Sequence, residues 1–148
     1  LFFSVLSLMM VFVQGPVLSR VAKIWSDDLL IVVGSLILGT NFVLLISSST
    51  IMIYLAAALF ALGNGLMWPS VLSLLSKAAG EKYQGSVQGI AGSSGSLASI
   101  LGLIIGGILY ELLDTGIFLV SAGIIYTVFF MSLGLFYYKK SVSEKECL

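Results

Sequence analysis

Five long apolar runs alternate with short polar turns along the chain. They occupy residues 1–18, 29–46, 51–75, 87–109 and 117–138. A transmembrane helix needs about 20 apolar residues, and a chain inside a bilayer has to satisfy its backbone hydrogen bonds internally, so runs of this length are helical there. The pattern predicts an all-α polytopic membrane protein, with a bundle of about five transmembrane helices over residues 1–138 and a polar tail over residues 139–148.

Composition agrees with a lipid bilayer as the solvent of this chain. Hydrophobic residues make up 59% of it and charged residues only 9%, whereas soluble domains are about a quarter charged. The chain has no His, and its single Cys is Cys147 in the polar tail. We therefore expect no His- or Cys-built metal site, no cofactor, no internal disulfide and no Cys–His catalysis. The net charge is zero, so the composition gives no sign of the basic surface that nucleic-acid binding requires.

The first residue, Leu1, already lies inside an apolar run, without a Met or a charged segment before it. We expect the chain to begin within a longer protein. The missing N-terminal half of that protein would complete the first run and pack against this part.

Small residues gather on one face of the fourth run. Residues three or four apart share a helix face, and small residues in membrane helices mark close helix–helix approach. We therefore expect this helix to pack against its neighbours along its whole length. The stripe consists of Gly85, Gly89, Gly92, Ser96, Ser99, Gly102 and Gly106.

The third run is interrupted by Gly63, Gly65 and Pro69. Pro69 has no backbone N–H, so it leaves the carbonyl of Gly65 without its helical partner and favours a bend. Such a bend would be either a gating hinge or a static kink filled by a neighbouring helix, and the sequence leaves both interpretations open.

Basic residues lie on alternate connections, and this alternation predicts the topology. Arg20 and Lys23, then Lys77 and Lys82, then Lys139, Lys140 and Lys145 occupy three of the polar segments, while the other two connections contain no Lys or Arg. The positive-inside rule places the basic segments, and with them the C-terminus, in the cytoplasm. Glu111 and Asp114 would then face the outside of a plasma (inner) membrane.

An ordered set of residues in the third and fourth runs also matches a known family. Pro69, Lys77, Gln84-Gly85, Gln88-Gly89, the segment at 96–100 and Gly102 follow one another at a spacing that resembles the tenth and eleventh spans of the major facilitator superfamily. The resemblance is to the drug:proton antiporter branch, which includes the tetracycline-efflux proteins. That branch often has Gly-Pro where this chain has Gly102-Leu103.

Gly15, Pro16 and Arg20 are similar to the cytoplasmic loop signature that joins spans eight and nine in this superfamily. The chain departs from the signature at Ser19, where an acidic residue is frequent, and at Ala22, where a Gly is usual. The resemblance implies that the five runs correspond to spans 8–12 of a twelve-span transporter.

The resemblance also suggests where substrate would bind, because the tenth and eleventh spans border the central cavity of such transporters. Asn64 and Trp68 would lie on one face of the tenth span, offering an amide and a flat apolar ring. Gln88, Ser93 and Ser96 carry amide or hydroxyl groups in the eleventh span. All five side chains could instead serve in packing and interhelical hydrogen bonding.

By this resemblance, the protein would be a secondary active transporter that works by alternating access about a midplane site. It would export small organic or drug-like molecules, driven by protons. No charge lies at bilayer depth in these runs, so a coupling carboxylate would belong to the missing upstream portion. The alternative is a helical membrane protein without a transport cycle, such as a structural or sensory subunit. An intramembrane enzyme is disfavoured because the runs contain no buried nucleophile–base pair.

Overall fold

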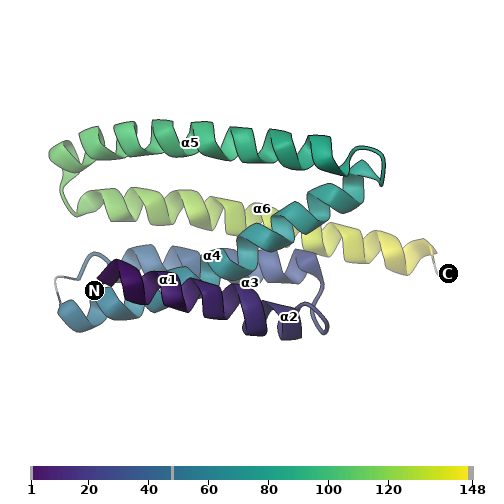
Figure 1. The fold of residues 1–148 in the computed structure, drawn as a ribbon, viewed down its shortest axis with the longest axis horizontal. Helices are drawn as coiled ribbons and strands as arrows, with labels where there is room; N and C mark the ends of the chain where they lie inside the picture. Colours follow the sequence, from purple (N-terminus) through teal and green to yellow (C-terminus); the bar gives the residue numbers. More distant parts are fainter. Residues whose placement is uncertain (1, 48, 147–148) are drawn as a thin grey trace.

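The computed structural model describes residues 2–47 and 49–146, and every regular element in them is helical. Figure 1 shows long helices lying roughly along one another, with the described chain ending at the side where α2 and α3 meet. The elements are α1 Phe2–Phe12, the π-helical turn η1 Val13–Val17, α2 Leu18–Val21, α3 Asp27–Leu44, α4 Thr50–Ala79, α5 Gln84–Leu113 and α6 Gly116–Glu146.

Five helical segments are long and apolar enough to cross a membrane, which confirms the predicted all-α fold with five spans. These segments are Ser4–Val21, Asp27–Leu44, Thr50–Ala79, Gln84–Leu113 and Gly116–Lys139. The predicted polar tail is helical as far as Glu146 because α6 continues beyond its apolar part. Residues 147–148, which include Cys147, lie outside the described part of the chain.

The first helical segment passes through Gly15 and Pro16, within the predicted run at 1–18, and continues past Arg20, which the resemblance to the loop signature placed in a connection. Gly15 and Pro16 lie in η1, and Arg20 lies in α2. A proline inside an α-helix clashes with the carbonyl four residues earlier, whereas a π-turn pairs residues five apart. The N–H of Leu18 accordingly reaches the carbonyl of Val13, so the helix passes Pro16 and ends only at Val21.

The helices α3 and α4 meet backbone to backbone at two glycines. A Cβ added to Gly63 would lie 2.9 Å from the carbonyl oxygen of Gly34, and a Cβ on Gly34 would lie 2.9 Å from that of Gly63. Leu30, Leu38 and Leu66 are buried around this crossing. The absence of two side chains therefore brings the two backbones into direct contact, as small residues do in membrane helices.

The helix α6 packs on the other side of α3 through a glycine and a tyrosine. A Cβ on Gly39 would lie 2.8 Å from the ring of Tyr126, and the Tyr126 hydroxyl lies 3.4 Å from Oγ1 of Thr40. The absence of a side chain at Gly39 therefore leaves room for the Tyr126 ring to pack on α3.

Ion pairs fasten one end of the same three helices. The carboxylate of Asp27, in the first turn of α3, accepts hydrogen bonds from Oγ of Ser73 at 2.7 Å and from Nζ of Lys77. The carboxylate of Asp28 accepts from Nζ of Lys139 at 2.7 Å. The N-terminus of α3 is thereby connected to both α4 and α6, where negative charge also suits the helix dipole.

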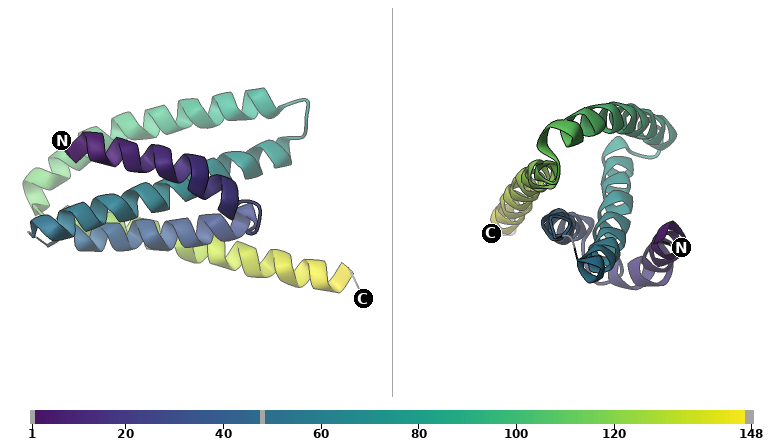
Figure 2. Two further views of the ribbon diagram at one scale, coloured as in Figure 1. Left: turned by 60° about the horizontal axis from the view of Figure 1, so that its bottom comes forward. Right: turned by 90° about the vertical axis from the view of Figure 1, so that its left-hand side faces the viewer.

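The helix α5 lies at one edge of the bundle, as the end-on view of Figure 2 shows, and none of its residues is buried. Apart from the adjoining backbone of α5 itself, no described atom lies within 4 Å of an added Cβ at five glycines of its small-residue stripe, namely Gly85, Gly89, Gly92, Gly102 and Gly106. Among the described helices, α5 therefore lacks the close neighbours expected along its whole length, and an interface at these glycines stays a prediction.

The glycine crossing predicts a sharp dependence of stability on one methyl group. Gly63→Ala should lower the free energy of unfolding by about 1–3 kcal/mol, because an inserted methyl group has to push two backbones apart. Gly123→Ala on α6 is the matched control, since a Cβ there meets nothing within 4 Å. Thermal unfolding of the purified full-length protein in detergent measures both, and equal midpoints for the two variants would contradict the contact.

The two aspartates of α3 should differ in their contribution to stability. Asp27→Asn weakens bonds to two donors, and its side chain is 13% exposed, whereas Asp28 has one described partner and is 25% exposed. We expect Asp27→Asn to cost about 1 kcal/mol and Asp28→Asn less, as exposed pairs do. The same unfolding measurement, repeated at high salt, tests this order; a larger loss at Asp28 would reverse our assignment.

Candidate functional site

A groove of about 500 Å³ opens between α4 and α5. Its walls are Asn64 and Trp68 from α4 and Gly92, Gly95, Ser96, Ala98 and Ser99 from α5. The structure thus brings together three of the five residues predicted to contact substrate, namely Asn64, Trp68 and Ser96.

The groove exists because a large side chain on one helix faces small residues on the other. Asn64 and Trp68 are four residues apart and therefore project from the same side of α4. The edge of the Trp68 ring would lie 3.4 Å from a Cβ on Gly95, so the indole reaches the bare backbone of α5. Trp68 is nevertheless 41% exposed, which leaves part of its ring open to a ligand.

The serine hydroxyl groups that line the groove already donate hydrogen bonds within α5. Oγ of Ser96 donates to the carbonyl of Gly92 at 3.0 Å, and Oγ of Ser99 donates to the carbonyl of Gly95 at 2.9 Å. This bond to the preceding turn is a common way to satisfy a hydroxyl within its own helix. Because the proton is committed, each serine offers a ligand the lone pairs of its oxygen.

Asn64 adds the one amide of the groove. Within the described residues the half-buried Asn64 side chain has no hydrogen-bond partner, so its donor and its acceptor are both available to a ligand. None of the groove residues is ionisable. The groove therefore offers uncharged hydrogen-bonding groups and an aromatic ring for binding a ligand.

Gln88 and Ser93 lie outside this groove. Nε2 of Gln88 donates to Oγ of Ser76 at 2.9 Å, which links α5 to α4 near the turn between them. Oγ of Ser93 donates to the carbonyl of Gly89 at 2.9 Å. Both side chains are exposed, but neither lines the groove with Trp68.

Sequence reasoning assigned Gly92 to helix packing and did not assign Gly95, Ala98 and Ser99 to the site. A signal was present, because Ser99 follows Gly92 and Ser96 on the small-residue stripe of α5. Gly95 and Ala98 lie beside that stripe, and only the direction of the Trp68 ring shows which part of α5 faces α4.

The glycines near Pro69 serve close packing in this structure. Gly63 contacts α3 at Gly34, and a Cβ on Gly65 would lie 2.8 Å from a methyl group of Val13 in η1. The helix α4 continues unbroken through Pro69. A hinge at this proline stays a prediction.

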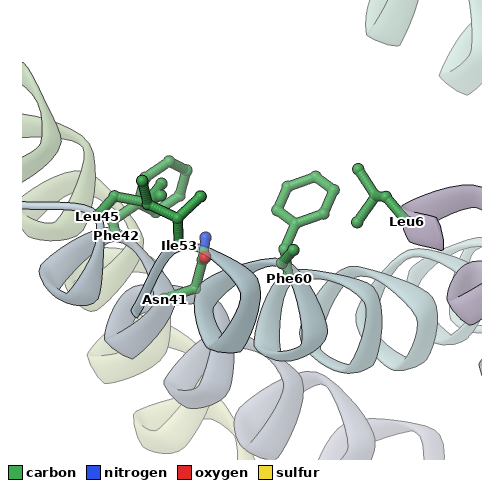
Figure 3. Close-up of a pocket in the computed structure, with 7 residues that line it drawn as sticks. Leu6, Asn41, Phe42, Leu45, Ile53 and Phe60 are labelled. Carbon is green, nitrogen blue, oxygen red and sulfur yellow. The ribbon is translucent and has the colours of Figure 1, made fainter. Parts of the chain in front are cut away.

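A second, smaller cavity of about 200 Å³ lies among α1, α3 and α4 (Figure 3). Phe42, Leu45 and Ile53 gather on one side of it, and Leu6 and Phe60 lie on the other. Its polar contribution comes from Asn41, which is 2% exposed and whose amide nitrogen has no hydrogen-bond partner among the described residues. With almost only apolar walls, this cavity offers little to recognise a specific substrate.

In the part of the chain that the structure describes, no three His, Cys, Asp or Glu side chains lie close enough together to hold a metal ion. Asp27 and Asp28, which are adjacent in the sequence, each accept from a lysine.

Comparison with known proteins identifies a family. The sequence matches the Major Facilitator Superfamily over residues 1–147. It is also 28% identical over 99 residues to a Bacillus subtilis (strain 168) protein described as the uncharacterized MFS-type transporter YttB. That match covers 65% of this chain and 25% of the relative, so the chain spans about a quarter of the length of the protein it resembles. No solved structure matches the chain.

The pairing of Gln88 with Ser76 can be tested by a double-mutant cycle. Gln88→Ala and Ser76→Ala should each lower the free energy of unfolding by about 1 kcal/mol, and the double variant should lose little more, because both changes remove the same hydrogen bond. Thermal unfolding provides the measurement. Losses that add fully would show that the two side chains do not interact.

Proposed function

The chain belongs to the Major Facilitator Superfamily, and from this premise we propose that it is part of a secondary active transporter that moves a small organic molecule by alternating access. The observation that carries the proposal is the groove between α4 and α5. Asn64 lies near the middle of Thr50–Ala79, and Ser96 and Ser99 lie near the middle of Gln84–Leu113. Substrate sites of secondary transporters occur at this depth, near the bilayer midplane.

The chemistry of the groove favours one class of substrate. Ser96 and Ser99 present acceptor oxygens because their protons are committed to their own helix, and the ring of Trp68 presents a π face. Such a surface suits a flat molecule that donates hydrogen bonds or carries a positive charge. We therefore propose drug-like organic compounds, aromatic or cationic, as substrates.

The arrangement of basic residues supports a cytoplasmic C-terminus. Lys77 and Lys139 both bind the first turn of α3, and Arg20 lies in the last turn of α2, which precedes α3. The basic connections therefore gather at one end of the bundle (Figure 1). The connections after α3 and α5 lie at the other end and contain no Lys or Arg. By the positive-inside rule, the end with the basic residues faces the cytoplasm. In a bacterium, the membrane would be the inner membrane.

Export coupled to protons is the mode that we propose for this transporter. The described groove has no carboxylate, and a proton-coupled site needs a group whose pKa responds to burial. We place that group in the remainder of the protein. A structural or sensory subunit without a transport cycle is the weaker proposal, since it would not need an open polar groove at mid-depth.

Transport by vesicles that contain the full-length protein tests the proposal. With an imposed pH gradient and the flat aromatic cation ethidium as probe, wild-type protein should accumulate the dye. Gly95→Leu should reduce the rate at least about tenfold, because the new side chain fills the space against Trp68 and overpacks the groove. Trp68→Ala should change the ranking of ethidium against a non-aromatic cation, since the stacking face is gone.

Gly123→Leu is the control for these variants, because it adds the same side chain at a position with no atom within 4 Å. It should transport at the wild-type rate. Folded yield, measured by size-exclusion chromatography, separates loss of transport from loss of protein. If Gly95→Leu transported normally, the groove would not be on the substrate path.

A further inference from the structure

A second groove, of about 380 Å³, lies at the corner between α2 and α3, at the end of the bundle where the basic residues gather. Its walls are apolar except at one point, where Arg20 contributes its side chain. The apolar walls include Val21, Ile24, Trp25, Val33 and Ile37. The groove thus combines a cationic head with an apolar body.

The charge of Arg20 has no partner in the described part of the chain, although two carboxylates lie close in sequence. Asp27 and Asp28 are the nearest acidic residues, and they bind Lys77 and Lys139. No ion pair joins Arg20 to either of these carboxylates in the described residues. A guanidinium group on an apolar surface is left free to bind an external anion.

The turn beside Arg20 exposes large apolar side chains. Ile24 is 81% exposed and Trp25 is 41% exposed. A connection that lies in water would carry polar side chains at such exposed positions. Burial of apolar surface is worth about 25 cal/mol per Å², so these side chains favour contact with hydrocarbon. Tryptophan is in addition enriched at the membrane–water interface.

The groove extends from this interface into the hydrocarbon region. Val33 and Ile37 follow the start of α3 at Asp27 by six and ten residues, which places them roughly 9–15 Å deeper at 1.5 Å per residue. Arg20 at the mouth and the valine and isoleucine along the wall therefore match the order of groups in a phospholipid, whose phosphate lies at the surface and whose acyl chain points inward.

We propose that this groove binds an anionic phospholipid of the adjacent leaflet. The guanidinium group of Arg20 holds the phosphate through two parallel hydrogen bonds, and one acyl chain lies along Val33 and Ile37. The choice of leaflet depends on the orientation given under the proposed function, in which this end of the bundle faces the anionic cytoplasmic surface.

Native mass spectrometry of the full-length protein tests the lipid site directly. The protein is reconstituted with phosphatidylglycerol or phosphatidylcholine of identical acyl chains and then released into detergent. Wild-type protein should retain phosphatidylglycerol, and Arg20→Gln should lower the retained fraction at least about fivefold, because a basic residue at the membrane surface attracts anionic lipid. Arg20→Lys keeps the charge but loses the planar fork, so its retention should fall between those of the other two.

Lys23→Gln is the matched control. It removes the same charge three residues away, from a side chain that does not line the groove, and it should retain phosphatidylglycerol as wild type does. A photoactivatable phosphatidylglycerol with its reactive group in mid-chain should label the α3 segment that contains Val33 and Ile37, and Val33→Trp should abolish this labelling by filling the groove.

Three results would overturn the site. Equal loss of lipid in Arg20→Gln and Lys23→Gln would reduce the effect to general surface charge, and labelling away from α3 would place the lipid elsewhere. Destabilisation by Arg20→Gln that is identical in both lipids would mean that Arg20 binds another part of the protein. Lipid retention is measured without transport, so a protein that keeps the lipid but carries no substrate would contradict only the proposed function.

Discussion

The approach of α3 and α4 at Gly34 and Gly63 determines how the rest of the bundle is arranged. In a bilayer, helices gain no hydrophobic energy by leaving lipid for one another, so van der Waals contact at short range has to hold them together. Two missing side chains allow the backbones to touch, with each carbonyl oxygen 2.9 Å from the Cβ position of the opposite glycine. This crossing brings Asp27 within reach of Lys77 and leaves the far side of α3 free for the Tyr126 ring of α6.

The groove between α4 and α5 forms because the close packing of α3 and α4 does not extend to α5. The helix α5 leaves the α3–α4 pair after the turn at Gly80, whose positive φ of 70° suits only glycine without strain, and it has no buried residue. Where α5 faces α4, Trp68 meets Gly95, and the small side chains beside the ring leave the space unfilled. Polar groups remain tolerable there because Ser96 satisfies its own proton within α5, which avoids the cost of an unpaired hydroxyl in hydrocarbon.

Those parts of the structure that depend on local sequence were predictable, and those that depend on side-chain direction were not. Apolar run length predicts the five spans, since the bilayer thickness fixes the length of each helix. The first run, at 1–18, already includes Pro16, but the π-turn there and the extension of the helix to Val21 were not predicted, because a π-turn leaves no signature in a single sequence. The family resemblance offered Gln88 as a cavity residue, with packing as the alternative, and in the structure Gln88 donates to Ser76 across the α4–α5 turn. The spacing of residues along one helix cannot predict such a contact between two.

The same contacts determine which helices of the described bundle are held together most firmly. The glycine crossing and the ion pairs of Asp27 and Asp28 connect α3 to α4 and α6, so motion within this group would break a backbone contact and two charged bonds together. The helix α5 contacts α4 through fewer groups, among them Gln88 at one end and the Trp68 ring at Gly95. A change in the width of the groove therefore costs least when α5 shifts relative to α4, because that motion separates a ring edge from a bare backbone and leaves the glycine crossing intact.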